Sequence, residues 1–508
     1  MKALVRRSTC PNDIKLMEKD TPTPSVGQLL VEVAYSGICT SDVFNAARQL
    51  QPNDRLRPPV ILGHEGAGIV VATGPEVSRF KIGDPVTAET TYESCGKCRY
   101  CKTGRLNLCP ERKSLGSTAD GFFAQFVVVP EQSAHHLGAL SLEEGAAIEP
   151  LACATHAVME RAKLKGTEVV GVFGPGMMGL LVSEVAKSCG CKVCLICTSH
   201  SLARVKALNG FEPDLIINRD NNNLKESVYD FSRTGFDIVF ECSGSLTAAR
   251  DALAVTRPGG CFLTLGEYPS SMDINLSAIL ITREITLKGS RSSTPWSWKE
   301  AIGIAQERKV HLQPLITHKL EMSQWEQGFA LVSKKEGIKI LLCRERVKLK
   351  SIDQKIGLRL DKDLIAVGIK TSCKEEVFST LFDKLYQKGY VKNTYLKAVL
   401  EREASFPTGL IMKDGIVAIP HVDTCYCVKP GIAIGFLENP IEMKEMGKPD
   451  NTLMVDGIFM LSVVKAEDQV HWLRQLIEVL QCEGTLSKIK QSNSPEEVCL
   501  ALNEAGLQ

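Results

Sequence analysis

The sequence has no long apolar segment, no excess of charge of either sign and no recognisable export signal. It contains no apolar run of about 18 or more residues, the length needed to cross a membrane. The stretch from Met1 to Asp20 has no apolar core of signal-peptide length. A formal net charge of +1 gives no electrostatic reason to expect nucleic acid or an anionic membrane as a partner. We therefore expect a cytoplasmic protein.

Nineteen cysteines stand out in an otherwise ordinary composition, which is 44% hydrophobic and 23% charged. Thiols stay reduced in the cytoplasm, so closely spaced cysteines there indicate metal binding rather than disulfides. A chain of 508 residues is expected to hold about two to four domains.

The first block, residues 1–150, contains apolar runs such as 28–34 and 68–72, which predict a β-rich domain. Within it, four cysteines follow one another at close, regular spacing. Four thiolates spaced in this way favour a closed tetrahedral site for structural zinc over four unrelated loop cysteines. The four residues are Cys95, Cys98, Cys101 and Cys109.

A second set of metal-binding side chains is spread along the same block. Cys39, His64 and Glu149 supply a thiolate, an imidazole and a carboxylate, and Glu65 directly follows the histidine. Cys, His and Glu with one position left for water or substrate are the ligands of a catalytic zinc site. A histidine beside glycine is more often an ordinary loop residue, so the prediction depends on these segments meeting.

The middle block, residues 151–289, alternates between strand-like and helical patterns. An apolar run over 168–173 leads into a Gly-x-Gly-x-x-Gly turn and a helical pattern over 180–186. Such a turn lets the backbone approach a pyrophosphate, which the helix N-terminus then faces. The alternation predicts a doubly wound parallel sheet. The expected cofactor-binding residues of the turn are Gly174, Gly176, Met177, Met178 and Gly179.

The expected second strand of this block ends at Cys197 without an acidic residue. An Asp or Glu there would bind a ribose 2′-hydroxyl, whereas a nearby arginine accommodates a 2′-phosphate. Ser199 and Arg204 therefore favour NADP over NAD, although Arg204 is almost equally typical of a solvated helix surface.

These two blocks resemble the zinc-dependent medium-chain alcohol dehydrogenases over about residues 1–345. Glu149-Pro150-Leu151 resembles the polyol (sorbitol-type) branch. The resemblance implies a GroES-like catalytic domain, completed by residues 290–345, and a Rossmann domain that binds NAD or NADP. It also implies one structural zinc and one catalytic zinc, the latter completed by Glu149 or Glu65.

Ser41 matches the hydroxyl that relays the substrate proton in this family. Phe44 departs from the family, in which a histidine often continues the relay, so the proton must leave through another group. A zinc-free quinone or enone reductase of the same superfamily is the alternative, and the candidate zinc ligands argue against it.

A third block begins after about Leu342. The charged segment 344–350 is predicted to be a linker or a first strand, and residues 346–508 can form a separate α/β domain. The expected elements are helices over 373–389 and 393–402 and strands over 430–437 and 456–464.

A histidine ends a strand-like run in this block, at Pro420-His421. From the residues alone, this histidine is as typical of an ordinary core or loop position as of a functional site. The block resembles fructose/mannitol-type enzyme IIA domains of the bacterial phosphoenolpyruvate-dependent phosphotransferase system, most closely the galactitol branch, over about residues 355–508. The resemblance implies that His421 carries a phosphoryl group, that Arg402 binds its oxygens and that His471 donates a hydrogen bond to it. It also implies HPr and a sugar-specific enzyme IIB as partners, and contact with a membrane only indirectly, through the transport complex.

The pairing of these two resemblances narrows the expected substrate. The transport system phosphorylates a sugar alcohol on entry, and oxidation to a ketose phosphate is the next catabolic step. We expect a homo-oligomer that oxidises a polyol or polyol phosphate, with galactitol 1-phosphate as the first choice. Two alternatives stay open: phosphorylation of His421 regulates the dehydrogenase, or the substrate is an unphosphorylated polyol.

Overall fold

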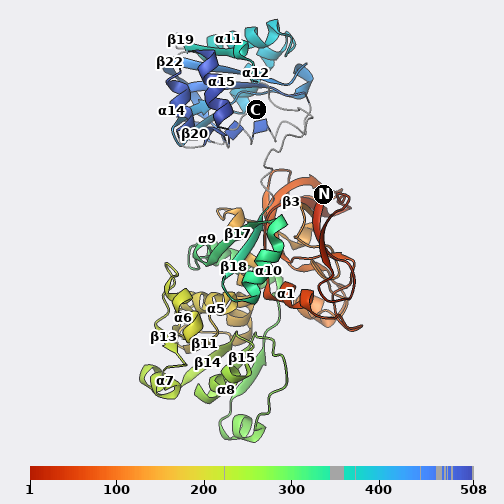
Figure 1. The fold of residues 1–508 in the computed structure, drawn as a ribbon, viewed down its shortest axis with the longest axis vertical. Helices are drawn as coiled ribbons and strands as arrows, with labels where there is room; N and C mark the ends of the chain where they lie inside the picture. Colours follow the sequence, from red (N-terminus) through yellow and green to blue (C-terminus); the bar gives the residue numbers. More distant parts are fainter. Residues whose placement is uncertain are drawn as a thin grey trace. The chain divides into compact units, whose positions relative to one another are not determined.

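The computed structural model consists of two compact units, Met1–Lys348 and Leu349–Gln508 (Figure 1). Among the described residues, no helix is both long and apolar enough to span a membrane. The structure describes residues 1–221, 223–343, 360–371, 373–446, 448–464, 472–473, 476–477, 479–481, 484–492 and 494–505.

The first part of unit 1 is built mainly from short strands, with three short helices. The strands are β1 (Lys2–Arg6), β2 (Ile14–Glu18), β3 (Gln28–Gly37), β4 (Val60–Ile61), β5 (Glu65–Thr73), β6 (Pro85–Ala88), β7 (Thr91–Glu93), β8 (Lys113–Ser114), β9 (Phe126–Pro130) and β10 (Ala134–His136). The helices are α1 (Thr40–Ala47), α2 (Arg99–Lys102) and α3 (Leu142–Gly145), with 3-10 turns η1 (Leu106–Leu108) and η2 (Glu131–Ser133). Strand β3 is central because it pairs with both β5 and β9. Its residues Leu29, Val31 and Val33 alternate into a buried apolar cluster.

The middle of unit 1 is a layered α/β domain. Its elements are α4 (Ile148–Thr155), the π-helix η3 (His156–Ala162), β11 (Val169–Phe173), α5 (Met177–Ser188), β12 (Lys192–Cys197), α6 (Ser199–Lys206), β13 (Leu215–Asn218), α7 (Leu224–Ser232), β14 (Phe236–Glu241), α8 (Leu246–Val255), β15 (Thr256–Thr264), the π-helix η4 (Ser277–Thr282) and β16 (Thr286–Gly289). The six strands are parallel and lie in the order β13-β12-β11-β14-β15-β16. This is the 3-2-1-4-5-6 order of a doubly wound sheet, so the expected Rossmann fold is confirmed. The strand order reverses between β11 and β14, where such sheets bind dinucleotides.

After β16 the chain returns to the first part of the unit. The returning elements are α9 (Pro295–Gln306), η5 (Gln313–Leu315), β17 (Ile316–Glu321), η6 (Met322–Gln324), α10 (Trp325–Ser333) and β18 (Lys339–Cys343). Strands β18 and β17 complete a seven-stranded sheet with β10, β6, β5, β3 and β9. Because β18 pairs antiparallel with β3 from Leu341↔Gly37 to Cys343↔Tyr35, Lys339 comes to lie near the end of β3.

Unit 2 is a separate three-layer α/β domain. Its elements are η7 (Lys362–Leu364), β19 (Ile365–Ile369), α11 (Lys374–Gln387), α12 (Tyr395–Ser405), β20 (Gly409–Met412), β21 (Gly415–Ala418), η8 (Thr424–Tyr426), β22 (Gly431–Glu445), β23 (Lys448–Ser462), α14 (Thr485–Lys490) and α15 (Pro495–Glu504). The sheet order is β19-β22-β20-β21-β23. Residues of α11 and α12 share one buried cluster with the sheet, and residues of α14 and α15 share another. The helices therefore form layers on both faces of the sheet.

The expected helices of this unit correspond to α11 and α12, but its two long strands extend further than the sequence predicts. The predicted strand over 430–437 continues to Glu445, and the strand predicted to begin at 456 begins at Lys448. Pro440 lies within a register shift between Phe436 and Ile441, where a residue without an N–H does not break the ladder. The segment 344–350 lies outside the described residues.

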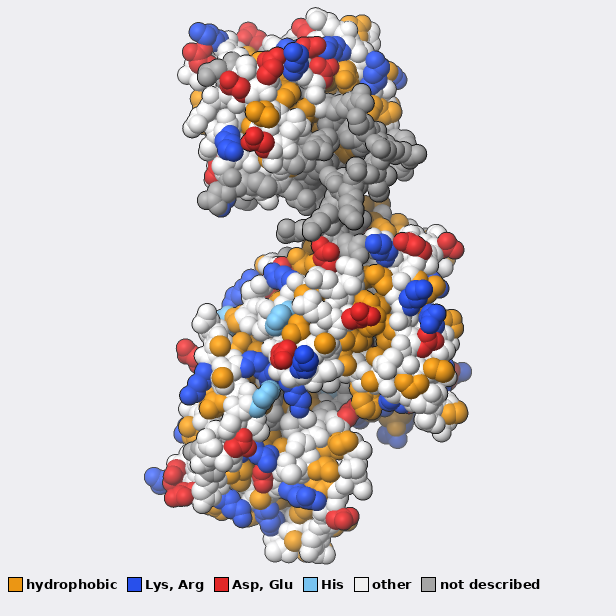
Figure 2. All heavy atoms as spheres, in the orientation of Figure 1, with side chains coloured by type: hydrophobic (Ala, Val, Ile, Leu, Met, Phe, Trp, Pro, Cys, Tyr) orange, Lys and Arg blue, Asp and Glu red, His pale blue; other side chains and the backbone are white. Residues whose placement is uncertain are grey.

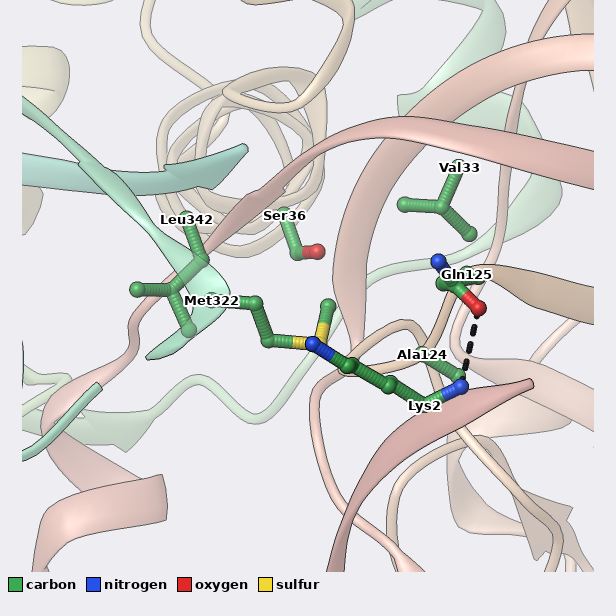
Figure 3. Close-up of a pocket in the computed structure, with 7 residues that line it drawn as sticks. All are labelled: Lys2, Val33, Ser36, Ala124, Gln125, Met322 and Leu342. Atoms are coloured by element: carbon green, nitrogen blue, oxygen red, sulfur yellow. Dashed lines mark hydrogen bonds between the residues drawn. The ribbon is translucent and has the colours of Figure 1, made fainter. Parts of the chain in front are cut away.

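The visible surface carries no large region of one charge. Lys and Arg side chains are interspersed with Asp and Glu over both units in the view of Figure 2, in keeping with the net charge of +1. A small pocket of unit 1 is drawn in Figure 3, and no site residue expected from the sequence lines it. Its lining residues are Lys2, Val33, Ser36, Ala124, Gln125, Met322 and Leu342.

Candidate functional site

The candidate catalytic zinc residues converge where β3 and β5 meet. The antiparallel register pairs Gly37 with Glu65, so Cys39 follows the end of one strand and His64 precedes the start of the other. The metal-binding atoms of Cys39, His64 and Glu65 all lie within 4.8 Å of one another. A Cβ on Gly37 would lie 2.1 Å from Glu65 Oε2, so the glycine leaves the space that this carboxylate occupies.

Two further residues hold this cluster in place. Asp42 accepts a hydrogen bond from the Cys39 backbone N–H at 3.0 Å, and its other oxygen lies 3.4 Å from His64 Nδ1. This contact leaves His64 Nε2 available for a metal, the usual role of a carboxylate behind a metal-binding histidine. Lys339 is almost fully buried and forms an ion pair with Glu65 at 2.5 Å.

The electrostatics of the cluster favour positive charge. Burial opposes a charge on His64, but Asp42 outweighs it and holds the pKa of His64 well above its ordinary value. Burial also opposes a charge on Lys339, whose pKa is nevertheless raised, first by Glu65 and then by Cys39. A half-buried thiolate and imidazole beside a buried carboxylate, which together attract cations, fit a zinc ion.

Glu149 and Ser41 lie beside this cluster. Glu149, on α4, interacts electrostatically with His64 and Glu65, but its carboxylate is not part of the group within 4.8 Å. Burial raises the pKa of Glu149, and Cys153 Sγ donates to its Oε1 at 3.4 Å. The Ser41 hydroxyl donates to Cys39 Sγ at 3.2 Å, so a group that can exchange protons lies directly at the cluster.

The four spaced cysteines form a compact group of their own. Their sulfur atoms lie 3.6 to 3.9 Å apart in three pairs, and all four lie within 4.8 Å. Tetrahedral zinc with bonds of about 2.3 Å places its sulfur ligands about 3.8 Å apart, so the geometry fits. Backbone N–H groups of Cys98 and Lys97 lower the pKa of Cys95 to about 7, which favours the metal-binding thiolate. Helix α2 carries Cys101, and Cys109 directly follows η1.

The glycine turn between β11 and α5 has the geometry of a dinucleotide site. Gly174 has a φ of +98°, and a Cβ there would lie 2.7 Å from Ser243. A Cβ on Gly179 would lie 1.9 Å from the Gly174 carbonyl oxygen, whereas one on Gly176 meets nothing within 4 Å. The outer glycines are therefore required by packing, and Gly176 leaves open space for a ligand at the N-terminus of α5.

The residues expected to determine the preference for NAD or NADP already form hydrogen bonds within the protein. Arg204 donates to the carbonyl oxygens of Pro175, at 3.3 Å, and Lys335. Ser199 is exposed at the start of α6, and its backbone N–H donates to Asp220 Oδ2 at 2.7 Å. Asp220 lies in the loop after β13. It thus supplies a carboxylate at the start of α6, where the end of β12 has no acidic residue of its own.

His421 in unit 2 is held through both of its ring nitrogens. Its Nδ1 donates to the carbonyl oxygen of Ile419 at 2.8 Å, and Arg402 Nη2 lies 3.2 Å from its Nε2. Burial lowers the pKa of His421, which keeps the imidazole neutral and Nε2 nucleophilic. Arg402 projects from α12, and its guanidinium lies 5.7 Å from the Phe406 ring centroid.

The neighbouring Glu403 has a positioning role. It is buried and accepts hydrogen bonds from the Thr408 backbone N–H at 3.0 Å and from its hydroxyl at 2.7 Å. These contacts fix the turn that follows α12. His471, the second histidine expected at this site, lies outside the described residues.

Three family descriptions match the chain. Residues 25–139 match the alcohol dehydrogenase GroES-like domain, and residues 178–307 match zinc-binding dehydrogenases. Residues 359–505 match the phosphoenolpyruvate-dependent sugar phosphotransferase system EIIA 2 domain. The chain therefore belongs to the zinc-binding medium-chain dehydrogenases and carries a C-terminal phosphotransferase-system EIIA 2 domain.

Several similar proteins are named as dehydrogenases of polyols or polyol phosphates. Sorbitol dehydrogenase of Halalkalibacterium halodurans is 38% identical over 67% of this chain and 99% of its own length. D-arabitol-phosphate dehydrogenase of Enterococcus avium is 32% identical over 67% of this chain and 97% of its own length. The crystal structure of galactitol-1-phosphate dehydrogenase from Escherichia coli covers 68% of this chain and all of its own, with 26% identity and a TM-score of 0.60.

Three residues of these sites were not expected from the sequence. Asp42 stands in the same short segment as Cys39, so its place behind His64 had a local signal. Lys339 is 274 positions away from its partner Glu65, and Asp220 follows a different strand from Ser199. Nothing local marks either of these two as part of a site.

Proposed function

We propose that residues 1–343 oxidise a polyol or polyol phosphate with zinc and NAD or NADP, and that unit 2 carries a phosphoryl group on His421. The observation that carries the first part is the convergence of Cys39, His64 and Glu65 in a cluster that attracts cations. The polyol names of the relatives support the substrate class.

The residues of the candidate catalytic site have distinct roles in this proposal. Zinc held by Cys39, His64 and Glu65 would supply a Lewis acid that lowers the pKa of a substrate hydroxyl. Ser41 takes the hydroxyl proton and passes it on. Lys339 keeps the Glu65 carboxylate in place and balances its charge. Phe44, at the position of the family's second relay residue, is exposed and cannot carry a proton, so water or a ribose hydroxyl continues the relay.

The redox step then follows the usual balance of an alcohol dehydrogenase. The carbinol C–H bond breaks, and its hydride passes to the nicotinamide ring. The hydroxyl proton leaves through Ser41, so the polyol becomes a ketose and the dinucleotide is reduced. Gly176 and the backbone N–H groups of Met177 and Met178 bind the pyrophosphate at the N-terminus of α5.

The same loops suggest which dinucleotide is used. A carboxylate beside the ribose accepts a hydrogen bond from a 2′-hydroxyl and repels a 2′-phosphate. We assign Asp220 to that position because it contacts Ser199 at the start of α6, whereas the Arg204 guanidinium is engaged with backbone carbonyl groups. We therefore propose NAD as the preferred cofactor, in place of the NADP favoured by the sequence.

Unit 2 relays phosphate in this account. HPr donates a phosphoryl group to His421 Nε2, Arg402 binds the oxygens, and the group passes to a sugar-specific enzyme IIB. Galactitol 1-phosphate is the proposed first substrate of the dehydrogenase, and the structure of the galactitol-1-phosphate dehydrogenase supports this choice. Regulation of the dehydrogenase by phosphorylated His421 is the alternative. Phosphoryl transfer to enzyme IIB that is lost in His421→Ala supports the relay, and dehydrogenase activity that changes on phosphorylation without transfer supports regulation.

The proposed oligomer uses the free edge of the Rossmann sheet. Strand β16 is an edge strand with β15 as its neighbour, and the adjoining η4 carries apolar side chains. Leu276 is 54% exposed and Ile281 is 76% exposed. An open strand edge beside apolar residues favours pairing with a second copy of the chain.

A further inference from the structure

Three arginines lie together at the edge of the candidate zinc site and belong to none of the sites above. Arg55 lies in the loop before β4, Arg112 directly precedes β8, and Arg291 follows β16 by two residues. Arg55 and Arg291 are close enough for their charges to act on Arg112 and on each other. Burial and then the charge of Arg55 lower the pKa of Arg112 to about 10.

The loop of Arg55 adjoins the segment that carries His64. The Arg57 backbone N–H donates to the Ser117 carbonyl oxygen at 2.9 Å, and a Cβ on Gly116 would lie 2.6 Å from the carbonyl oxygen of Gly63, next to His64. The Glu149 carboxylate interacts electrostatically with Arg112 as well as with His64 and Glu65. The arginine cluster is therefore a neighbour of the zinc cluster.

Hydrogen bonds fix the loops that carry two of these arginines. Arg112 donates through Nε to Thr91 Oγ1 at 2.9 Å and through Nη2 to Thr90 Oγ1 at 2.7 Å. Nη2 also lies 3.4 Å from Ser292 Oγ, next to Arg291. Asn107 Nδ2 donates to the Arg291 carbonyl oxygen at 2.8 Å. None of these contacts uses Nη1 of Arg112, which stays available to a ligand.

The negative groups that act on the cluster, Glu149 on Arg112 and Cys109 on Arg55, do not form ion pairs with it in the described part of the chain. Within the described ranges, none of the three arginines forms an ion pair, whereas Arg48 pairs with Asp54 and Arg257 pairs with Asp237. Three guanidinium groups that repel one another without a directly paired counter-ion are a local conflict, and such conflicts are expected at functional sites. In the same loop as Arg291, the Ser290 hydroxyl oxygen is buried and has no hydrogen-bond partner in the described part of the chain.

We propose that Arg55, Arg112 and Arg291 bind the phosphate of a phosphorylated polyol whose carbinol carbon lies at the Cys39–His64–Glu65 cluster. This inference rests on the proposed dehydrogenase function and specifies the phosphorylated form of its substrate. Guanidinium groups bind phosphate oxygens through paired N–H donors, which makes arginine suited to this ligand. The alternative role of the cluster is to balance the charge of the four-cysteine zinc site, because the Cys109 charge acts on Arg55.

The test compares phosphorylated and free forms of one polyol in the full-length protein. Arg55→Gln and Arg291→Gln are measured beside Arg7→Gln, a control in which the lost arginine pairs with Asp13 on the surface. Each cluster variant should lower kcat/KM for the polyol phosphate about 10- to 100-fold, the usual effect of losing one charged hydrogen bond. The value for the free polyol, the zinc content and the Arg7→Gln control should stay unchanged.

Two readouts separate this inference from the proposed function. Equal losses for both substrates, or losses that accompany a loss of zinc, would overturn the phosphate site and favour charge balance at the cysteines. Calorimetry with inorganic phosphate tests the site without turnover, and binding that disappears in the Arg55→Gln/Arg291→Gln double variant supports it. If the wild type oxidises no polyol, the proposed function fails, while this binding result still decides the arginine site. No phosphate binding by the wild type would overturn the inference.

Discussion

Replacement of Lys339 by methionine is expected to destabilise unit 1 by about 3–5 kcal/mol in the zinc-free protein. The side chains of Lys339 and Glu65 are 3% and 1% exposed, and Nζ lies 2.5 Å from Oε2. Removing one partner of a buried pair leaves the other charge buried and uncompensated, which has this cost. Methionine has a similar length and avoids a large cavity, so the loss reports mainly on the charge.

The zinc-loaded protein should respond less to the same substitution. Without Lys339, the Glu65 carboxylate has a cation to bind only when zinc is present, so zinc should offset part of the loss. The double variant Lys339→Met/Glu65→Gln should lie near the parent in the zinc-free form, because neither charge remains.

Urea unfolding followed by tryptophan fluorescence measures these differences. Trp296, Trp298 and Trp325 lie in unit 1, and a Trp472→Phe background removes the signal of unit 2. A zinc-free Lys339→Met protein within about 1 kcal/mol of its parent would refute the reasoning, since buried pairs normally show larger effects. An equal loss in the double variant would do the same.

Four further predictions follow from the other sites. Gly176→Ala should leave the urea midpoint of unfolding unchanged and weaken dinucleotide binding at least about 10-fold by calorimetry. Gly179→Ala should instead lower the midpoint itself, because its Cβ would lie 1.9 Å from a carbonyl oxygen. The reverse pattern would contradict these roles. Because the pKa of His421 in the folded protein lies below its ordinary value of 6.5, its phosphorylation rate should stay constant from pH 8 down to pH 6.5 and fall only at lower pH. A rate that already halves at pH 6.5 would count against a neutral buried imidazole. Asp220→Asn should raise kcat/KM with NADP relative to NAD by about 10-fold or more, and an unchanged ratio would remove Asp220 from cofactor choice. Ile281→Asp should shift the protein toward monomers in sedimentation, and an unaltered oligomer would place the interface elsewhere.

The parts of the site that depend on short sequence spacing could be predicted before the structure. The cysteines from Cys95 to Cys109 share one loop region, so their separation alone brings the sulfur atoms together. The glycine turn is likewise local, because strand, turn and helix follow one another directly. Fold class follows from the same regular alternation of strands and helices.

The parts that depend on tertiary pairing could not be predicted in this way. Lys339 meets Glu65 only because β18 pairs with the end of β3, more than 300 residues earlier in the chain. Asp220 supplies a carboxylate from the loop after a neighbouring strand, which the sequence around Cys197 does not reveal. The arginine cluster combines three loops, and no spacing relates Arg55 to Arg291. Even the extension of β22 through Pro440 depends on a bulge that only its partner strand reveals.

The most direct test of the whole account is zinc content and turnover measured on the same purified full-length protein. The panel contains galactitol 1-phosphate, other polyol phosphates and the corresponding free polyols, each with NAD and with NADP. The account predicts close to two zinc ions per chain and NAD-linked oxidation of a phosphorylated polyol in preference to its free form. Two zinc ions without oxidation of any polyol, phosphorylated or free, would contradict the proposed function.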